Sequence, residues 1–214
     1  EFDEACGTIG HIGIFSLNYH KHLHTGEGGM CVTSDPDLAK RLQLIRNHGE
    51  NAVDWLEIDD PVNMVGSNYR MTELSAAIGR VQLANIDEHV AKREAVAKSL
   101  SAAISGIDGV TAPVVREGCR HNYYCWTVRI AKEELGIDRA TFTSALLAEG
   151  FPLSVGYAEP LYKLPAFQKR IAIGREGFPF NLSDRRYTDG MCPVVERLYA
   201  DEAWFFEPCA YDLD

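Results

Sequence analysis

Residues that can do chemistry are concentrated in one run near the beginning of the chain. Lys21 lies at its centre, with Ser16 before it and a glycine-rich turn after it. An amine held among hydroxyl, amide and imidazole groups can form a Schiff base with a carbonyl compound. His20, His22 and His24 alternate around it and could instead face one side of an extended chain as a metal site. No carboxylate or cysteine partner completes such a set at close spacing, so we expect no metal and assign the chemistry to Lys21.

The composition disfavours several classes of protein. The 214 residues are 46% hydrophobic and 24% charged, which is ordinary for a globular protein, and the net charge of −10 disfavours nucleic acid and anionic membranes as partners. No apolar run approaches the roughly 18 residues of a membrane span. The acidic start, Glu1-Phe2-Asp3-Glu4, does not resemble a secretory signal. Six cysteines without CxxC spacing indicate reduced, buried thiols. We therefore expect a cytoplasmic protein.

The elements around Lys21 follow from local patterns. Short apolar runs at 12–15 and 30–33 predict buried strands on either side of the lysine loop. Asp35 as N-cap and Pro36 in the first turn predict a helix, which Gly49 would end as C-cap. Strands and a helix in succession favour an α/β layer.

The rest of the chain changes character near residue 105. Helical spacing from about 74 to 104 predicts two helices, or one long helix bent near 85–87. The aromatic and β-branched run 123–130 favours a strand, Asp138 caps a helix, and 151–155 predicts a further strand. We expect a smaller α+β domain here, with ordered loops over the proline-rich stretch that follows.

Two segments carry a family resemblance. The run from Phe15, F-S-x-N-x-x-K-x-x-x-T-G-E-G-G, resembles the cofactor-lysine segment of the DegT/StrS family of pyridoxal-phosphate sugar aminotransferases. Residues 66–71 match that family's G-x-N-x-R-M segment. Weaker matches extend the resemblance from about Gly7 to Leu198 and lie at 76–83 (A-A-x-G-x-x-Q-L), 121–124, 156–161 and 192–198.

The resemblance implies a fold and its division. It implies the α/β fold of the fold-type I, aspartate aminotransferase-like enzymes, here part of the large mixed-sheet domain plus a small α+β domain. Residues 1–86 would be the C-terminal part of the large domain that binds pyridoxal 5'-phosphate. Residues 87–104 would be a connecting helix, and residues 105–214 the small domain.

The resemblance also implies site residues. Lys21 would carry the cofactor, and Ser16 would bind its phosphate. Asn68 would reach the phosphate of the neighbouring subunit, so the working unit would be a homodimer with a shared active site. Arg70 and Tyr157 would contact substrate, since a guanidinium suits carboxylate and phosphate groups.

The implied activity is amino transfer to a nucleotide-linked keto sugar, with an amino acid, glutamate, as donor, in amino-sugar biosynthesis. Lys21, displaced by the donor, would act as the acid–base group beside the substrate α-carbon. A sugar dehydratase of the same fold is an alternative, but those relatives carry histidine in place of the lysine.

The sequence departs from the family in length. Members are about twice as long, and their N-terminal half holds a ring-stacking aromatic and a D-x-x-Q segment whose aspartate pairs with the pyridine nitrogen. Asp3 lies too close to Lys21 to fill that role. We therefore interpret the chain as the C-terminal half of such an enzyme. A truncated, non-catalytic dimerisation or regulatory fragment is the other alternative.

Overall fold

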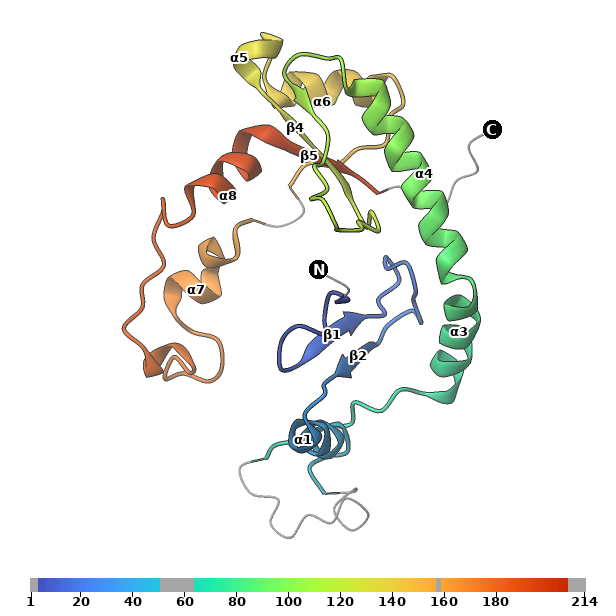
Figure 1. Cartoon of the computed structure of the whole chain (residues 1–214). Coiled ribbons are helices and arrows are strands. Elements are labelled where there is room, and N and C mark those ends of the chain that lie inside the picture. Colours follow the sequence, from blue (N-terminus) through green and yellow to red (C-terminus); the bar gives the residue numbers. More distant parts are fainter. Residues whose placement is uncertain (1–3, 51–63, 157–158, 208–214) are drawn as a thin grey trace. The chain divides into compact units, whose positions relative to one another are not determined.

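A computed structural model describes residues 4–50, 64–156 and 159–207. Its contacts divide the chain into two compact units (Figure 1). The first comprises Glu1–Ala91 with Glu117–Arg120, and the second comprises Lys92–Arg116 with His121–Asp214. Within the described ranges, no helix combines the length and the apolar character that crossing a membrane requires.

The first unit contains an antiparallel hairpin whose connection is the lysine loop. Strand β1 (Gly13–Ser16) pairs with β2 (Gly29–Val32), and Ser16 lies opposite Gly29. Both strands lie within one residue of their predicted positions. The prediction that they are buried is wrong, since Ile14 is 77% exposed and β2 has no buried residue. The described elements of this unit leave the faces of the hairpin uncovered.

Helix α1 (Pro36–Arg46) begins where the sequence predicts. Asp35 caps it by accepting hydrogen bonds from the backbone N–H groups of Asp37 at 2.8 Å and Leu38 at 3.1 Å. The predicted C-cap is wrong by two residues, because Asn47 ends the helix. Gly49 follows with φ +81° and donates its N–H to the carbonyl of Leu44 at 2.7 Å, so it still closes the last turn.

The predicted long helical stretch is two helices. Helix α3 (Glu73–Ala84) ends at Asn85, and α4 (Ile86–Ile104) follows at once. Thr72 caps α3 through a hydrogen bond from the Ser75 N–H at 3.1 Å. Asn85 donates its side-chain amide to the carbonyl of Val81 at 3.0 Å, which closes the end of α3. The break predicted near 85–87 is confirmed.

The second unit holds most of the buried core. Strands β3 (Val110–Thr111), β4 (Trp126–Ile130) and β5 (Ala203–Phe206) form an antiparallel sheet in that order. Alternate residues of β4 are buried, and they pack with Trp204, Phe206 and residues of α4. The indole N–H of Trp126 donates to Ser101 Oγ at 2.9 Å, so its burial leaves no donor unsatisfied.

Short helices complete the second unit. Helices α5 (Lys132–Leu135) and α6 (Arg139–Ala148) follow β4, and Asp138 caps α6 as predicted. The remaining helices are η1 (Leu161–Lys163), α7 (Pro165–Lys169), η2 (Phe180–Leu182), α8 (Pro193–Arg197) and the π-helix η3 (Leu198–Glu202). The predicted strand at 151–155 is wrong, because only one bridge, between Ser154 and Phe205, forms there.

Burial differs between the two units. Among its described residues, the first unit buries only two apolar side chains, Leu17 and Leu44. With so small an apolar core, this unit depends more on the hydrogen bonds of its loops and helix ends for its stability.

The cysteine prediction is half right. The five described cysteines are free thiols, but Cys6, Cys31 and Cys119 are exposed, and Cys209 lies outside the described residues.

Candidate functional site

The lysine loop joins β1 to β2 and is closed by backbone hydrogen bonds. The N–H of Leu17 donates to the carbonyl of Gly28 at 3.0 Å, and the N–H of Thr25 donates to the carbonyl of Leu17 at 3.0 Å. Leu17 and Thr25 are buried, whereas Lys21 is half-buried. The loop is therefore anchored at both ends and presents Lys21 near its middle.

Asn18 organises the backbone that carries Lys21. Its carbonyl accepts the N–H of Lys21 at 2.9 Å, which makes residues 18–21 a tight turn. Its side-chain oxygen accepts the N–H of His20 at 3.2 Å, and its side-chain amide donates to Glu27 Oε1 at 2.9 Å. One side chain thus joins the turn before the lysine to the glycine-rich segment after it.

Ser16 lies at the end of β1, directly before this turn. Its hydroxyl oxygen accepts the N–H of Asn18 at 3.3 Å. This bond uses an acceptor site, and the O–H donor of a serine is a separate group. Ser16 and Lys21 are therefore both tied to Asn18, and the structure brings these two predicted site residues together on one loop.

The histidines of the loop have different surroundings. No cluster of three or more metal-ligating side chains occurs within the part of the chain that the structure describes. The rings of Tyr19 and His20 stack, with centroids 3.8 Å apart. The Nδ1 atom of His24 is buried without a hydrogen-bond partner among the described residues. An unsatisfied buried polar atom is costly, so the described residues alone do not satisfy this imidazole.

Asn68 is held by the C-terminal end of α1. Its neighbours Ser67 and Tyr69 donate backbone N–H groups to the carbonyls of Ile45 at 2.9 Å and Arg46 at 3.1 Å. The Asn68 side-chain oxygen accepts the N–H of Arg70 at 3.3 Å. Asn68 and Arg70 are both exposed, so their amide and guanidinium donors face outward from this segment.

The Asn68 segment and the lysine loop approach each other at one point. A Cβ atom added at Gly28 would lie 3.5 Å from Cε of Met71. The hydrogen bond between Asn68 and Arg70 lies within their own segment, and a backbone bridge joins Asn68 to Asn47, the residue that ends α1. Tyr157, the remaining predicted site residue, lies outside the described residues.

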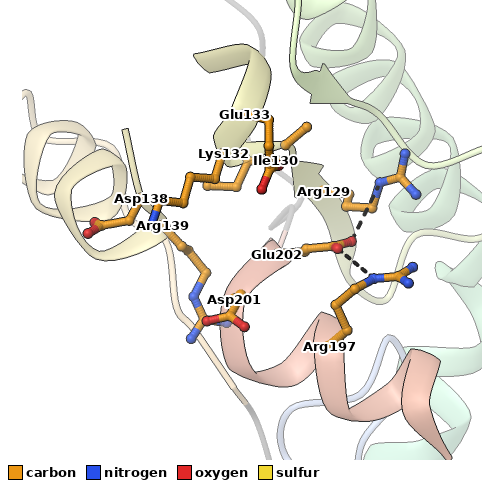
Figure 2. A pocket seen from close by; sticks show the side chains of 10 residues that line it. Arg129, Ile130, Lys132, Glu133, Asp138, Arg139, Arg197, Asp201 and Glu202 are labelled. Carbon is orange, nitrogen blue, oxygen red and sulfur yellow. Dashed lines mark ion pairs between the residues drawn. The ribbon is translucent and has the colours of Figure 1, made fainter. Parts of the chain in front are cut away.

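The second unit contains a separate pocket of about 480 Å³, lined by residues of β4, α5, α6, α8 and η3. Figure 2 shows Arg129 and Arg197 directed at Glu202, with nitrogen–oxygen distances of 3.9 Å and 2.6 Å. Arg139 donates to the carbonyls of Tyr199 at 2.6 Å and Ala203 at 3.0 Å. These arginines bind groups of the protein itself. Their hydrogen bonds and ion pairs therefore stabilise the junction of η3 and β5.

A second polar cluster surrounds Glu196 in α8. Its carboxylate accepts the Tyr162 hydroxyl and the N–H of Gly190 at 2.8 Å, and it pairs with Lys163 at 3.3 Å. The hydrogen bond from Tyr162, followed by those from Gly190 and Lys163, lowers the pKa of Glu196. Partial burial and the same hydrogen bond raise the pKa of Tyr162 to about 12. The cluster joins η1 to α8.

Sequence reasoning missed the residues that hold the lysine loop in place. Thr25 and Glu27 were interpreted only as parts of the glycine-rich pattern, and Gly79 only as part of a helix motif. Asn18 carried a usable signal, because an asparagine side chain often accepts the backbone N–H two residues further on, as it does here from His20. Thr25 lies beside Gly79 of α3, since a Cβ atom added at Gly79 would lie 3.1 Å from the Thr25 methyl group, and this proximity of distant segments leaves no local signal.

Comparison of the sequence with known proteins identifies its family. Residues 2–202 match the DegT/DnrJ/EryC1/StrS aminotransferase family model. GDP-perosamine synthase of Caulobacter vibrioides is 40% identical over 132 residues, which are 60% of this chain and 34% of that protein. The L-glutamine:2-deoxy-scyllo-inosose aminotransferase of Streptomyces kanamyceticus is 33% identical over 187 residues, 81% of this chain and 44% of that protein.

The fold agrees with solved structures. The aminotransferase from Psychrobacter cryohalolentis superimposes with a TM-score of 0.79 at 26% identity, over 99% of this chain and 54% of that one. The predicted fold-type I class is thereby confirmed. The chain spans less than half the length of the curated relatives it matches. With the family model covering nearly all of its length, the chain belongs to the DegT/DnrJ/EryC1/StrS aminotransferase family.

Proposed function

We propose that this chain is part of a pyridoxal-phosphate-dependent aminotransferase that transfers an amino group from an amino acid to a nucleotide-linked keto sugar. One observation carries the proposal. Lys21 is half-buried on a loop closed at both ends, and its backbone N–H is fixed by Asn18 at 2.9 Å. The turn and the closed loop hold the backbone from which this amine extends, which is the support that a functional group at a site requires.

The residues present fit part of the cofactor's requirements. Lys21 offers the primary amine, and Ser16, on the same loop, offers a hydroxyl donor for the phosphate. The resemblance also implies a carboxylate opposite the pyridine nitrogen, and Asp3 lies too close to Lys21 in the sequence to fill that role.

The chain's own residues would act by holding and moving protons. When bound, pyridoxal phosphate supplies an electron sink for the charge that develops at the substrate α-carbon. Lys21 Nζ would take the proton from that carbon and deliver it to the cofactor carbon that bears the amino group, which requires an amine held at a fixed place. The Asn18 turn fixes that place, because it sets the backbone from which the amine extends.

The other site residues are proposed for binding. Asn68 would donate to the cofactor phosphate of a neighbouring subunit, so the working unit would be a homodimer, and Arg70 and Tyr157 would contact an anionic substrate. The exposure of Asn68 and Arg70 supports this, since groups that serve another subunit or a ligand need outward-facing donors.

The names of the relatives indicate which acceptors and donors of the amino group should be considered. One is named for a GDP-linked product and another for a dTDP-linked sugar, which supports a nucleotide-linked acceptor. Three others are named L-glutamine:2-deoxy-scyllo-inosose aminotransferases. These names suggest glutamine as a donor to test beside glutamate. They also suggest an acceptor named without a nucleotide, to test beside the nucleotide-linked keto sugar.

The first experiment is the visible spectrum of the purified protein with added pyridoxal phosphate, followed by borohydride and mass spectrometry. We expect an absorption band that bleaches and a reduced pyridoxyl group on Lys21. Lys21→Arg, which keeps the charge, should abolish both, and Lys163→Arg in the second unit is the matched control. Absence of the band in the wild-type protein would show that the chain alone is not a competent enzyme. Modification of a different lysine would refute the assignment of Lys21.

A further inference from the structure

Thr25 is a buried side chain within the lysine loop. It is 6% exposed, and its backbone N–H donates to the carbonyl of Leu17 at 3.0 Å. Its hydroxyl donates to the carbonyl of Glu27 at 2.8 Å. Both polar groups of Thr25 thus have partners inside the loop, so burying them costs little.

The methyl group of Thr25 contacts helix α3 at the one place where that helix has no side chain. A Cβ atom added at Gly79 would lie 3.1 Å from Cγ2 of Thr25, closer than the 3.5–4.0 Å at which carbon atoms attract. The φ angle of Gly79 is not in the left-handed region, so its backbone does not require glycine. Glycine inside a helix costs about 0.5–1 kcal/mol relative to alanine. The packing of the Thr25 methyl group against the helix at this position offsets that cost.

A second glycine encloses the hydroxyl side of Thr25. A Cβ atom added at Gly28 would lie 2.9 Å from Thr25 Oγ1. Because threonine is branched at Cβ, its methyl and hydroxyl directions are fixed together by one rotamer. The two glycines and the Glu27 carbonyl therefore define one position for this side chain.

The position of Thr25 determines the position of the backbone that carries Lys21. The hydrogen bond from Thr25 to Leu17 closes residues 17–25 into a loop, and Lys21 is at its midpoint. A displacement of Thr25 away from α3 must be taken up within this closed loop. An amine that acts on a bound carbon is sensitive to such shifts, since a misplacement of about 1 Å can cost about 100-fold.

We propose that Thr25 is a positioning residue that fixes Lys21 relative to α3, and that Gly79 provides the space it needs. The inference rests on the proposed role of Lys21 and adds the element against which that lysine is held. The contact lies wholly within the first unit, between the lysine loop and α3.

The test is a double-mutant cycle on the two residues. Gly79→Ala adds the Cβ atom that meets the Thr25 methyl, and Thr25→Ser removes that methyl while keeping the hydroxyl. We expect Gly79→Ala to weaken pyridoxal-phosphate binding, titrated by visible absorbance, by about tenfold. The double variant should recover most of this loss, since removing the methyl relieves the contact. Gly10→Ala is the matched control, because a Cβ atom there has no neighbour within 4 Å.

A measurement without cofactor separates this inference from the proposed function. An amine-reactive ester labels the lysines of each variant, and mass spectrometry gives the rate at Lys21 relative to the other lysines. Gly79→Ala should change this relative rate, and the double variant should restore it, whether or not pyridoxal phosphate binds. Failure of the proposed function would instead appear as a wild-type protein without the absorption band.

Loss of stability alone gives a different result. If Gly79→Ala lowers the melting temperature but leaves the relative labelling of Lys21 equal to that of Gly10→Ala, the positioning role is refuted. Lack of rescue by Thr25→Ser also refutes it. Should Gly79→Ala fail to fold, Thr25→Ser alone is labelled, and a relative rate at Lys21 equal to that of the wild type refutes the positioning role.

Discussion

The side chains of Asn18 and Glu27 join the two ends of the lysine loop through a hydrogen bond of 2.9 Å from Asn18 Nδ2 to Glu27 Oε1. Glu27 belongs to the glycine-rich pattern, so this pattern contributes an anchor as well as a turn. Gly26 and Gly28 on either side of it have φ angles of +82° and +150°, which only glycine adopts without strain. The glycines let the chain turn, and the carboxylate between them holds the preceding turn in place.

Asn18 and Glu27 are separable by substitution. Asn18→Ala removes the bonds to both His20 N–H and Glu27, whereas Glu27→Ala removes only the second. Amide hydrogen exchange measured by NMR should therefore accelerate at His20 in Asn18→Ala and remain near the wild-type rate in Glu27→Ala. Each variant should lose about 1 kcal/mol of stability or less, as expected for exposed hydrogen bonds. Equal acceleration in both variants would show that the Glu27 bond orders the whole turn.

Gly66 is required for the Asn68 segment to reach α1. A Cβ atom there would lie 2.3 Å from the Gly49 nitrogen and 2.4 Å from the His48 carbonyl carbon, both backbone atoms that cannot turn away. Gly66→Ala should accelerate amide exchange at Ser67 and Tyr69, whose N–H groups bond to α1, and destabilise the protein by about 2 kcal/mol. Gly106→Ala, with no neighbour within 4 Å, is the control. Unchanged exchange at both amides would contradict this prediction.

The sequence predicts those features that depend on neighbouring residues. Asp35 and Pro36 locate the start of α1, and the strands around the lysine loop follow from short apolar runs. It does not predict that Ile14 is exposed, because that depends on what covers the hairpin. It also misses the packing of Thr25 beside Gly79, since only the fold brings these distant residues so close that a Cβ atom added at Gly79 would lie 3.1 Å from the Thr25 methyl group.

Arg139 supports the junction of η3 and β5 through two carbonyl oxygens. Arg139→Met keeps much of the side-chain length and removes the donors to Tyr199 and Ala203. We expect a loss of about 2 kcal/mol in urea unfolding, since hydrogen bonds from charged donors are worth about 1.5–3 kcal/mol. Arg197→Met is the matched control from the same pocket, where a half-exposed ion pair with Glu202 should contribute about 1 kcal/mol or less. Equal losses would show that the hydrogen bonds from Arg139 to the two carbonyl oxygens stabilise the protein no more than the ion pair of Arg197 does.

The cluster around Glu196 predicts how stability depends on pH. A carboxyl group with a lowered pKa stabilises the folded state above its ordinary pKa, and this contribution is lost as the pH falls through the folded value. Lys163 has the opposite sign, because the hydrogen bond to Asp189 and then that to Glu196 raise its pKa, so its contribution is lost only at alkaline pH. Tyr162, with a pKa of about 12, likewise contributes until strongly alkaline pH. Between these limits the cluster is fully formed.

Acid should therefore loosen the link between η1 and α8 through Glu196. Glu196→Gln should flatten the fall in melting temperature between neutral pH and pH 3, because the group that takes up the proton is gone. In Tyr162→Phe the fall should be smaller and complete at a higher pH, since the largest cause of the lowered Glu196 pKa is removed. Tyr199→Phe is the control, because the Tyr199 hydroxyl makes no hydrogen bond within the described ranges and only its carbonyl accepts one, from Arg139. If all three variants follow the wild-type acid profile, Glu196 does not link η1 to α8 in solution.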